Sequence, residues 1–303
     1  MTNITIIITT FNSEKTILRT INSILSQDGI GNDFHVELIV VDDCSSDDTL
    51  KILKENSIEY ISTGRNSGGP NKGRNIGLAN STGDFICITD HDDEWLPDKL
   101  KSQLAVSHLA PIISCGYTEI NEATGFHRNY VNRSDNECDY RLYPDNKTFI
   151  SHLTRIHQGQ VAYIGGLMFH HSLNNILFEE KYSMVDYDWF LRLFHRQTSV
   201  EICRALYIRR ISGNNLSLNE SYRLNDYHHS LSTLDGYRSL YPDEVRKASK
   251  RINGTMGRYY YKMEKMKEAR KYFLQSEKNL KMLAYLITSI CGYKWVNNKF
   301  KVF

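Results

Sequence analysis

Three aspartates, Asp90, Asp92 and Asp93, follow the apolar run 86–89 within four positions of the chain. Carboxylates held about 5 Å apart repel one another by roughly 3 kcal/mol per pair at an effective dielectric constant near 20. Either bulk water on a solvated turn or a bound cation must offset that repulsion. Carboxylate oxygens are the ligands that Mg²⁺ and Mn²⁺ prefer, together with waters and substrate phosphates. We therefore expect a divalent cation, Mn²⁺ or Mg²⁺, at this strand end. A solvated turn in which Asp93 or Glu94 caps the next helix is the alternative interpretation.

A second acidic pair, Asp42 and Asp43, ends the apolar run that begins at residue 35. The pair precedes the serines and aspartates at 45–48, which are suited to capping a helix. A carboxylate at this position can accept a hydrogen bond from an imide N–H or a ribose hydroxyl. The first apolar run ends in "TTFN", where Thr9 adds a hydroxyl and Phe11 an aromatic face.

A glycine-rich loop, "GRNSGGPNKGRN", spans residues 64–75. It has neither the spacing of a P-loop nor that of a dinucleotide-binding fingerprint. Asn66 offers polar groups in this loop. Arg74, at the start of a predicted helix, is suited to bidentate binding of a phosphate.

The elements that must position these residues alternate between strand and helix. Apolar runs predict strands, and helical spacing with an N-cap at Ser13 predicts the first helix. The expected strands are 4–10, 35–43, 58–63 and 84–90, and the expected helices are 13–28, 45–56, 97–109 and one emerging from the loop at 64–82. Four repeats of this alternation indicate an α/β fold with a doubly wound, mostly parallel sheet. Ligands bind beyond the carboxyl ends of the strands in such sheets, where the polar clusters lie.

The pattern is less regular after residue 110. We expect strands at 111–120, 162–170 and 199–211, a helix at 186–197, and helices beyond about residue 220. The predicted organisation is an α/β domain at 1–215, with a change of pattern near residue 110. A helical C-terminal region at 216–303 follows it.

Composition places this chain of 303 residues among globular proteins, with 41% hydrophobic and 24% charged residues. Its six cysteines are scattered singly, which argues against a disulfide framework or a zinc knuckle and fits the reducing cytoplasm. The N-terminus shows no basic segment or cleavage site typical of a secretory signal. No apolar run approaches the roughly 20 residues that span a bilayer.

Charge is distributed unevenly along the chain. From Arg246 onward there are 15 basic and 3 acidic residues, a net charge of +12, and the remainder carries −10. The apolar segment 282–291 is flanked by Lys, Tyr and Trp, so one hypothesis is peripheral attachment to an anionic membrane surface on the inner face of the cell membrane. Packing of this segment on the catalytic domain is the alternative. No nucleic-acid-binding motif accompanies the charge.

In order and spacing, six motifs resemble those of family 2 glycosyltransferases of the GT-A fold, of the bacterial surface-polysaccharide type. These motifs are "IIITTFN", "SILSQ", "LIVVDDCSSDDT", "NSGGPNKGRNIGL", "GDFICITDHDDEWLPDKL" and "VDYDWFLRL". The resemblance covers roughly residues 3–215. It implies that 1–215 is the catalytic domain, with a donor half at about 1–110 and an acceptor half at about 111–215. It also implies a nucleotide-sugar donor, most often a UDP-sugar, and inversion at the anomeric carbon.

The resemblance also assigns roles by position. Thr9 and Asp43 would contact the base of the donor, and Asp90 would lie near its ribose. Asp92 would ligate the metal at the diphosphate, and Asp186 would take the proton from the acceptor hydroxyl. Phe11, Asn66 and Arg74 are the remaining residues expected to contact the donor.

Two positions depart from the family pattern. Val185 stands where the family usually has a glutamate, and Ile211 or Ser212 stands where it often has a histidine. His91, inside the acidic cluster, is a candidate replacement ligand, and Asp188 is a local competitor of Asp186. The implied function is transfer of a sugar to a hydroxyl of a glycan acceptor, or of a lipid-linked oligosaccharide. The alternatives are a catalytically silent nucleotide-binding or membrane-tethering relative and a metal-dependent nucleotidyltransferase.

Overall fold

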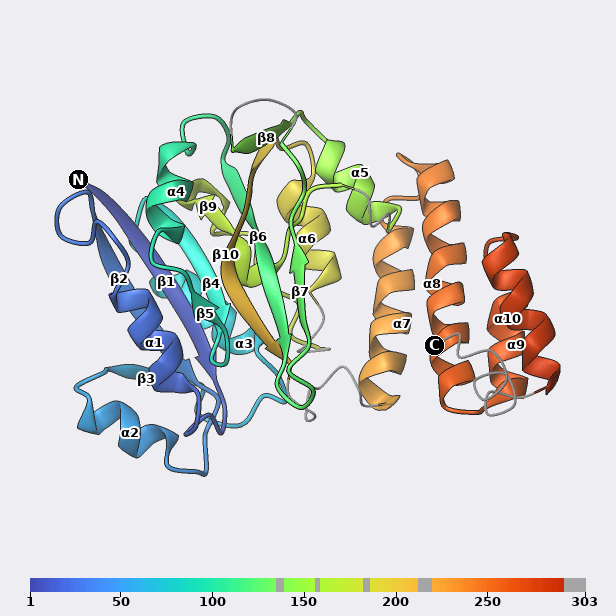
Figure 1. The fold of residues 1–303 in the computed structure, drawn as a ribbon, viewed down its shortest axis with the longest axis horizontal. Helices are drawn as coiled ribbons and strands as arrows, with labels where there is room; N and C mark the ends of the chain where they lie inside the picture. Colours follow the sequence, from blue (N-terminus) through green and yellow to red (C-terminus); the bar gives the residue numbers. More distant parts are fainter. Residues whose placement is uncertain (135–138, 156–158, 182–185, 212–219, 292–303) are drawn as a thin grey trace. The chain divides into compact units, whose positions relative to one another are not determined.

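The structure, a computed structural model, describes residues 1–134, 139–155, 159–181, 186–211 and 220–291. The chain divides into two compact units (Figure 1). The first comprises residues 1–149 and 158–215, and the second comprises residues 150–157 and 216–303.

A single mixed sheet runs through the first unit (Figure 1). Its strand order is β3-β2-β1-β4-β9-β6-β10-β5, with β7 added on β6 and β8 on β10. The strands are β1 (Thr2–Thr10), β2 (Phe34–Asp42), β3 (Tyr60–Ser62), β4 (Phe85–Asp90), β5 (Glu94–Trp95), β6 (Ile112–Asn121), β7 (His127–Tyr130), β8 (Tyr140–Tyr143), β9 (Met168–His170) and β10 (Ser199–Ile211). The four strands predicted in the N-terminal half are all parallel, which confirms that part of the topology. Strand β10 is parallel to β6, whereas β5, β7, β8 and β9 pair in antiparallel fashion.

Side chains of β1 alternate between two buried layers, as the period of a strand requires. Ile4, Ile6 and Ile8 join the core cluster that includes the apolar face of α1 (Ile17–Leu25). On the other face, Ile7 lies against α3 (Asn71–Asn80), where a Cβ on Gly77 would come within 2.3 Å of it. A strand covered on both faces accounts for the unbroken β-branched run in the sequence.

The remaining helices of the first unit are short. They are α2 (Thr49–Glu55), α4 (Lys99–Ala105), α5 (Lys147–Leu153), whose last residues fall in the second unit, and α6 (Tyr187–Phe194), with the 3₁₀ turns η1 (Ile164–Gly166) and η2 (His171–Leu173). Two expectations were wrong here. Helix α1 is shorter than the predicted 13–28 and its N-cap is Thr16, because the Ser13 hydroxyl bonds to Thr10 and its N–H to Thr49.

The predicted strand 162–170 is reduced to β9, since η1 occupies its first half. Close packing explains this turn. A Cβ on Gly165 would lie 2.9 Å from the Asp93 carboxylate, and one on Gly166 would lie 3.0 Å from the Tyr207 ring. Backbone at this point must therefore approach the end of β4 more closely than a side chain allows.

The second unit is helical where it is described, as expected beyond residue 220. It contains α7 (Glu220–Asp235), α8 (Pro242–Lys262), α9 (Met266–Leu274) and α10 (Leu280–Cys291). Its core is aromatic and includes Tyr261, Phe273 and Tyr285. Gly257 lets α8 approach α9, because a Cβ there would lie 2.6 Å from the Phe273 ring.

Candidate functional site

The carboxyl ends of β1, β2 and β4 meet at one edge of the sheet. Thr9 pairs in register with Asp90 of β4, and Thr10 pairs with Asp42 of β2. The expected convergence of these polar residues therefore follows from the parallel register.

Arg74 is buried beside the acidic strand end. One terminal nitrogen of its guanidinium lies 2.9 Å from Oδ1 of Asp90, and the other donates to the side-chain oxygen of Asn71 at 3.2 Å. Only 4% of Arg74 is exposed, and its Nε has no hydrogen-bond partner among the described residues. The buried guanidinium of Arg74 thus offsets part of the repulsion among the carboxylates of this strand end, even without a metal ion.

Asp93 is 3% exposed, so the interpretation of residues 90–93 as a solvated turn with Asp93 as a helix cap is wrong. Glu94 begins β5 instead, and α4 starts after Asp98. Burial raises the pKa of Asp93 well above its ordinary value. The neighbouring Asp90 and Asp92 raise it further, whereas Arg209 and a backbone hydrogen bond from Arg210 lower it. Its Oδ2 has no hydrogen-bond partner in the part of the chain that is described.

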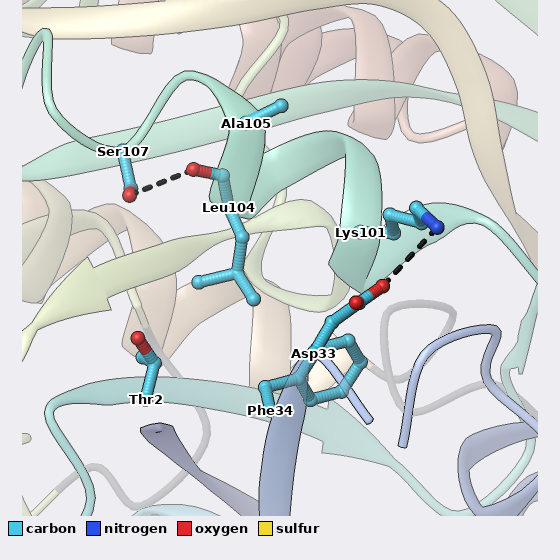
Figure 2. A pocket seen from close by; sticks show the side chains of 7 residues that line it. All are labelled: Thr2, Asp33, Phe34, Lys101, Leu104, Ala105 and Ser107. Atoms are coloured by element: carbon cyan, nitrogen blue, oxygen red, sulfur yellow. Dashed lines mark hydrogen bonds and ion pairs between the residues drawn. The ribbon is translucent and has the colours of Figure 1, made fainter. Parts of the chain in front are cut away.

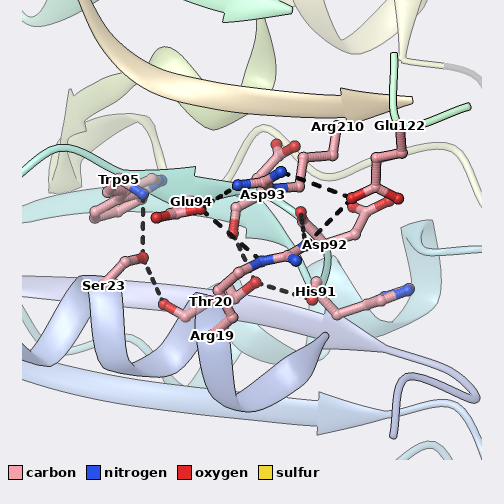
Figure 3. A network of polar contacts seen from close by, with 10 residues as sticks. All are labelled: Arg19, Thr20, Ser23, His91, Asp92, Asp93, Glu94, Trp95, Glu122 and Arg210. Atoms are coloured by element: carbon pink, nitrogen blue, oxygen red, sulfur yellow. Dashed lines mark hydrogen bonds and ion pairs between the residues drawn. The ribbon is translucent and has the colours of Figure 1, made fainter. Parts of the chain in front are cut away.

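Asp92 is partly buried at the same turn. Burial raises its pKa, His91 and Arg209 lower it, and Asp90 raises it. The turn itself is held by α1, since the Thr20 hydroxyl donates to the carbonyls of Asp93 at 2.6 Å and of His91 at 2.9 Å (Figure 3).

The donor set at this turn fits a divalent cation. Asp90 and Asp92 supply carboxylate oxygens, and Asp90 is close enough to raise the pKa of Asp92. No group of three potential metal-binding side chains occurs among the described residues. Two carboxylates are sufficient for Mg²⁺ or Mn²⁺, which complete their coordination with waters and substrate phosphates. His91 is turned toward the first strand, with Nδ1 3.3 Å from the carbonyl oxygen of Thr9.

The residues expected to contact the base lie around the same edge but differ in exposure. Thr9 and Asp43 are buried, and Phe11 is 41% exposed. The carboxylate of Asp43 accepts from the Thr63 hydroxyl at 2.8 Å and from the Ser67 N–H at 2.9 and 3.0 Å. Asp43 therefore fixes the start of the glycine-rich loop, a contact that the sequence did not reveal.

Asn66 is exposed in that loop, and its side-chain oxygen accepts from the N–H of Gly68 at 2.8 Å. Asp42 is used locally, because both of its oxygens accept hydrogen bonds from Ser45. Of the two acids at the end of β2, Asp43 is thus the one that reaches the glycine-rich loop.

A network of ion pairs beside the turn was not predicted from the sequence (Figure 3). Arg210 of β10 lies 2.7 Å from Glu94 and 3.7 Å from Glu122. Arg19 of α1 lies 3.9 Å from each of these glutamates and donates to the carbonyl of Asp92 at 3.3 Å. This network connects α1, β5 and β10 to the acidic turn. Its members are too far apart in the sequence to form a recognisable motif.

Helix α6 is linked to Arg74 through aromatic rings. The guanidinium carbon of Arg74 lies 5.2 Å from the centroid of Phe178, and this ring stacks on Trp189 at 4.4 Å with an interplanar angle of 11°. Trp189 belongs to α6, whose N-cap residue is Asp186. The predicted base is thereby connected to the predicted donor-binding arginine.

Two asparagines of α3 fasten the segment that leads toward α6. Asn75 accepts from the N–H of Phe178 at 2.7 Å and donates to its carbonyl at 2.9 Å. Asn71 donates to the carbonyl of Glu179 at 2.8 Å. These residues stand in the motif "PNKGRN", but nothing in the sequence pointed to their partners more than 100 residues away.

Asp186 occupies the N-cap position of α6 without a capping hydrogen bond from its side chain. Burial raises the pKa of Tyr163, Arg209 lowers it, and Asp90, Asp93 and Asp186 each raise it. Asp186 and the acidic turn are therefore both close enough to Tyr163 to raise the pKa of its phenol. Asp188 is paired with Arg192, whose Nε lies 2.8 Å from it. The departing positions Val185 and Ser212 lie outside the described residues, and Ile211 ends β10.

A separate pocket of about 460 Å³ lies at the other end of the strands (Figure 2). It is lined by Thr2 and Phe34, the first residues of β1 and β2, and by residues of α4 and its surroundings. Its position at the amino ends of the strands separates it from the acidic turn.

Comparison with known proteins identifies the family. A family model described as "Glycosyl transferase family 2" matches residues 5–170. The chain belongs to this family. The family resemblance inferred from the motifs is thus confirmed, and so is the α/β fold class.

Relatives of this family 2 member include bacterial surface-polysaccharide enzymes. TarS of Staphylococcus aureus, a poly(ribitol-phosphate) β-N-acetylglucosaminyltransferase, is 38% identical over 109 residues, which cover 35% of this chain and 19% of TarS. WfgD of Escherichia coli, a UDP-Glc:α-D-GlcNAc-diphosphoundecaprenol β-1,3-glucosyltransferase, is 35% identical over 105 residues. These cover 34% of this chain and 40% of WfgD. The matched segments thus span less than half of either relative.

Solved structures show the same fold. The crystal structure of TarS residues 1–349 with UDP-GlcNAc has a TM-score of 0.57 at 20% identity, covering 99% of this chain and 91% of that one. The mannosyltransferase PcManGT of Pyrobaculum calidifontis, with GDP-Man and Mn²⁺, has a TM-score of 0.56 at 13% identity, covering 95% and 79%. Within the described residues of this family 2 member, no helix is long and apolar enough to cross a membrane.

Proposed function

We propose that this chain is an inverting, metal-dependent glycosyltransferase that moves a sugar from a nucleotide-sugar to a hydroxyl of a glycan. The observation that carries the proposal is the connection from the acidic turn to α6 through Arg74, Phe178 and Trp189. This connection joins the edge of the sheet proposed to bind phosphate and metal to α6, which begins after the carboxylate of Asp186. A single-displacement transfer requires that pairing of groups.

The donor would lie along the carboxyl ends of the parallel strands. We propose that the base of the donor is contacted by Thr9, Phe11, Asp43 and the loop at Asn66. The ribose would lie near Asp90. The guanidinium of Arg74 would favour the diphosphate electrostatically and can bind it through two N–H groups. A Mg²⁺ or Mn²⁺ ion held by Asp92 would supply Lewis-acid stabilisation of the leaving diphosphate. UDP is the nucleotide we propose. TarS has been crystallised with UDP and with UDP-GlcNAc, and WfgD is named as an enzyme that uses UDP-Glc.

Asp186 is the proposed general base. Inversion in one step needs a carboxylate within hydrogen-bond reach of the acceptor oxygen, opposite the leaving group. Asp186 is the N-cap residue of α6, the helix whose Trp189 stacks on Phe178. Asp188, the weaker candidate, pairs with Arg192.

The acceptor we propose is a glycan or a lipid-linked oligosaccharide of a surface polysaccharide. The support is that WfgD acts on a diphosphoundecaprenol-linked sugar. Such an acceptor would place the enzyme in the cytoplasm at the inner face of the cell membrane, held peripherally. The division into a donor half up to about residue 110, an acceptor half up to 215 and a separate helical region from 216 is part of the same proposal.

The test is product analysis with the full chain. UDP-sugars would be screened by thermal shift with and without Mn²⁺, and a donor at 100 times its Kd is expected to stabilise the protein by about 2.7 kcal/mol. The stabilising donor would then be incubated with glycan acceptors. Release of UDP with a new glycosidic bond supports the proposal. Release of pyrophosphate would instead identify a nucleotidyltransferase, and binding without turnover would identify a catalytically silent relative.

A further inference from the structure

Helix α10 carries a stripe of exposed aliphatic side chains. Its members are spaced three or four residues apart, so they lie on one face of the helix. They are Leu280, Leu283, Ile287 and Ile290, with exposed fractions of 87, 51, 56 and 76%. The opposite face packs into the core of the second unit through Met282 and Tyr285. We call these four residues the α10 stripe.

The α10 stripe places four exposed aliphatic side chains on one helix face, whereas exposed apolar residues on an ordinary surface are scattered singly. Leu274, which ends α9, is a further exposed aliphatic side chain of the same unit, at 69% exposure. Contiguous apolar patches of this kind mark surfaces that are covered by a partner or a membrane. A covering partner must therefore have apolar chemistry in addition to any charge.

A cationic pocket lies in the same unit as the stripe. It has a volume of about 500 Å³ and is lined by Arg238, Arg246 and Lys250 together with Asp243. Gln275 also lines it and follows Leu274 in the chain, so the pocket reaches the end of α9.

The arginines of this pocket are held only by weak ion pairs. Arg238 pairs with Asp235 at 2.5 Å and Arg246 with Asp243 at 2.9 Å, and the four side chains are 65–69% exposed. Exposed ion pairs contribute little stability, so these arginines can exchange carboxylate for phosphate at small cost.

We propose that the second unit docks on an anionic lipid bilayer. The α10 stripe enters the boundary between headgroups and acyl chains, and the cationic pocket takes a lipid phosphate. Charge complementarity favours this occupant, since the exposed Lys278 and Lys281 flank the start of the stripe. Amphipathic helices with basic flanks bind anionic interfaces in this way. The biological purpose of the docking, access to a lipid-linked acceptor, rests on the proposed function.

Vesicle flotation of the full chain tests the proposal without any donor or acceptor. Wild type is expected to float with vesicles of phosphatidylcholine and phosphatidylglycerol, and not with pure phosphatidylcholine. The double variant Leu283→Glu/Ile287→Glu should lower the bound-to-free ratio at least about tenfold. The matched control is Leu25→Glu/Leu142→Glu, two leucines of the first unit that are 51% and 50% exposed, and it should leave the ratio unchanged.

Charge reversal in the pocket, Arg246→Glu/Lys250→Glu, should also weaken binding and reduce its dependence on salt. Salt acts because the Debye length falls from about 10 Å at 0.1 M to about 3 Å at 1 M. Melting curves should match wild type for every variant, since the substituted side chains are exposed.

Equal flotation of wild type and the stripe variant would overturn the proposal, and so would equal binding to neutral vesicles. An oligomer detected by light scattering that the stripe variant dissociates, without vesicle binding by wild type, would assign the stripe to contacts between copies. Titration with UDP separates this inference from the proposed function. Vesicle binding with no affinity for UDP would refute the enzymatic role and leave the docking surface intact.

Discussion

The guanidinium of Arg74 lies over the ring of Phe178, 5.2 Å from its centroid, while it also pairs with Asp90 at 2.9 Å. One buried side chain thereby contacts the acidic turn after β4 and the segment that leads to α6. Substitutions along this connection are expected to affect donor binding and catalysis to different extents.

Arg74→Lys should weaken donor binding although the charge is kept. Lysine lacks the planar group that stacks on Phe178 and bonds to Asp90 and Asn71 together. We expect a loss of about 1–2 kcal/mol in the free energy of unfolding and a lower affinity for UDP, measured by denaturation and calorimetry. Arg65→Lys, at an exposed position in the same loop, is the control and should behave as wild type. Unchanged UDP affinity in Arg74→Lys would contradict a role in donor binding.

Asn75→Ala should reduce kcat more than it raises KM for the donor. The substitution removes two hydrogen bonds to the backbone of Phe178 and one to the Glu180 carboxylate. It leaves partly buried polar groups unsatisfied, which costs about 1–3 kcal/mol. Helix α6 and Asp186 would then be less firmly positioned. Asn80→Ala, on the exposed end of the same helix, loses only a bond to the Ile76 carbonyl and serves as the control. Equal effects of the two substitutions on kcat would argue against a role of Asn75 in positioning α6.

Asp186→Asn should lower kcat by about 10²–10⁴-fold, the usual contribution of a general base. UDP binding should be retained, because the substitution preserves the size of the side chain and lies outside the proposed donor site. Asp188→Asn tests the neighbouring carboxylate and is expected to affect thermal stability through loss of the Arg192 pair, with a much smaller change in kcat. If Asp188→Asn instead abolished turnover, the assignment of the base would move to that residue.

Asp92→Asn should remove the effect of Mn²⁺ on UDP affinity. Calorimetric titrations of UDP with the metal and with a chelator measure this effect directly. Wild type is expected to lose affinity when the metal is chelated, and the variant should bind with the same low affinity in both conditions. A variant that kept the full metal dependence would exclude Asp92 as a ligand. Asp98→Asn, at the start of α4, provides the control because its partner is Arg204.

Stability should depend on pH through His152 of α5. Burial lowers its pKa to about 4, with a further decrease caused by Arg155, against an ordinary value of 6.5. The unfolded chain therefore binds a proton between pH 6.5 and 4 that the folded chain does not, so stability falls as pH decreases through this window. At 1.36 kcal/mol per pH unit, the loss approaches about 3 kcal/mol at pH 4.

Chemical denaturation at pH 4.5 and pH 7 of His152→Gln should show a smaller difference than wild type. The exposed His35→Gln is the control and should retain the wild-type difference. An unchanged pH dependence in His152→Gln would show that other groups are responsible.

The amino-acid sequence by itself determined the parallel sheet and the position of its acidic edge. Unbroken β-branched runs such as that of β1 require burial on both faces, and parallel register then brings Thr9 beside Asp90. These features depend on local patterns of apolar residues and on the regular alternation of strand and helix along the chain. Motif order was enough for the family as well.

Tertiary structure alone decided which polar groups are buried and what holds them. The pattern could not show that Asp93 is buried against Gly165, or that Glu94 begins a strand paired with β10. Nor could it show that Asn75 reaches Phe178, 103 residues away. Such contacts join segments whose meeting depends on packing of the whole unit, and side-chain burial is a property of that packing rather than of the neighbouring residues in the chain.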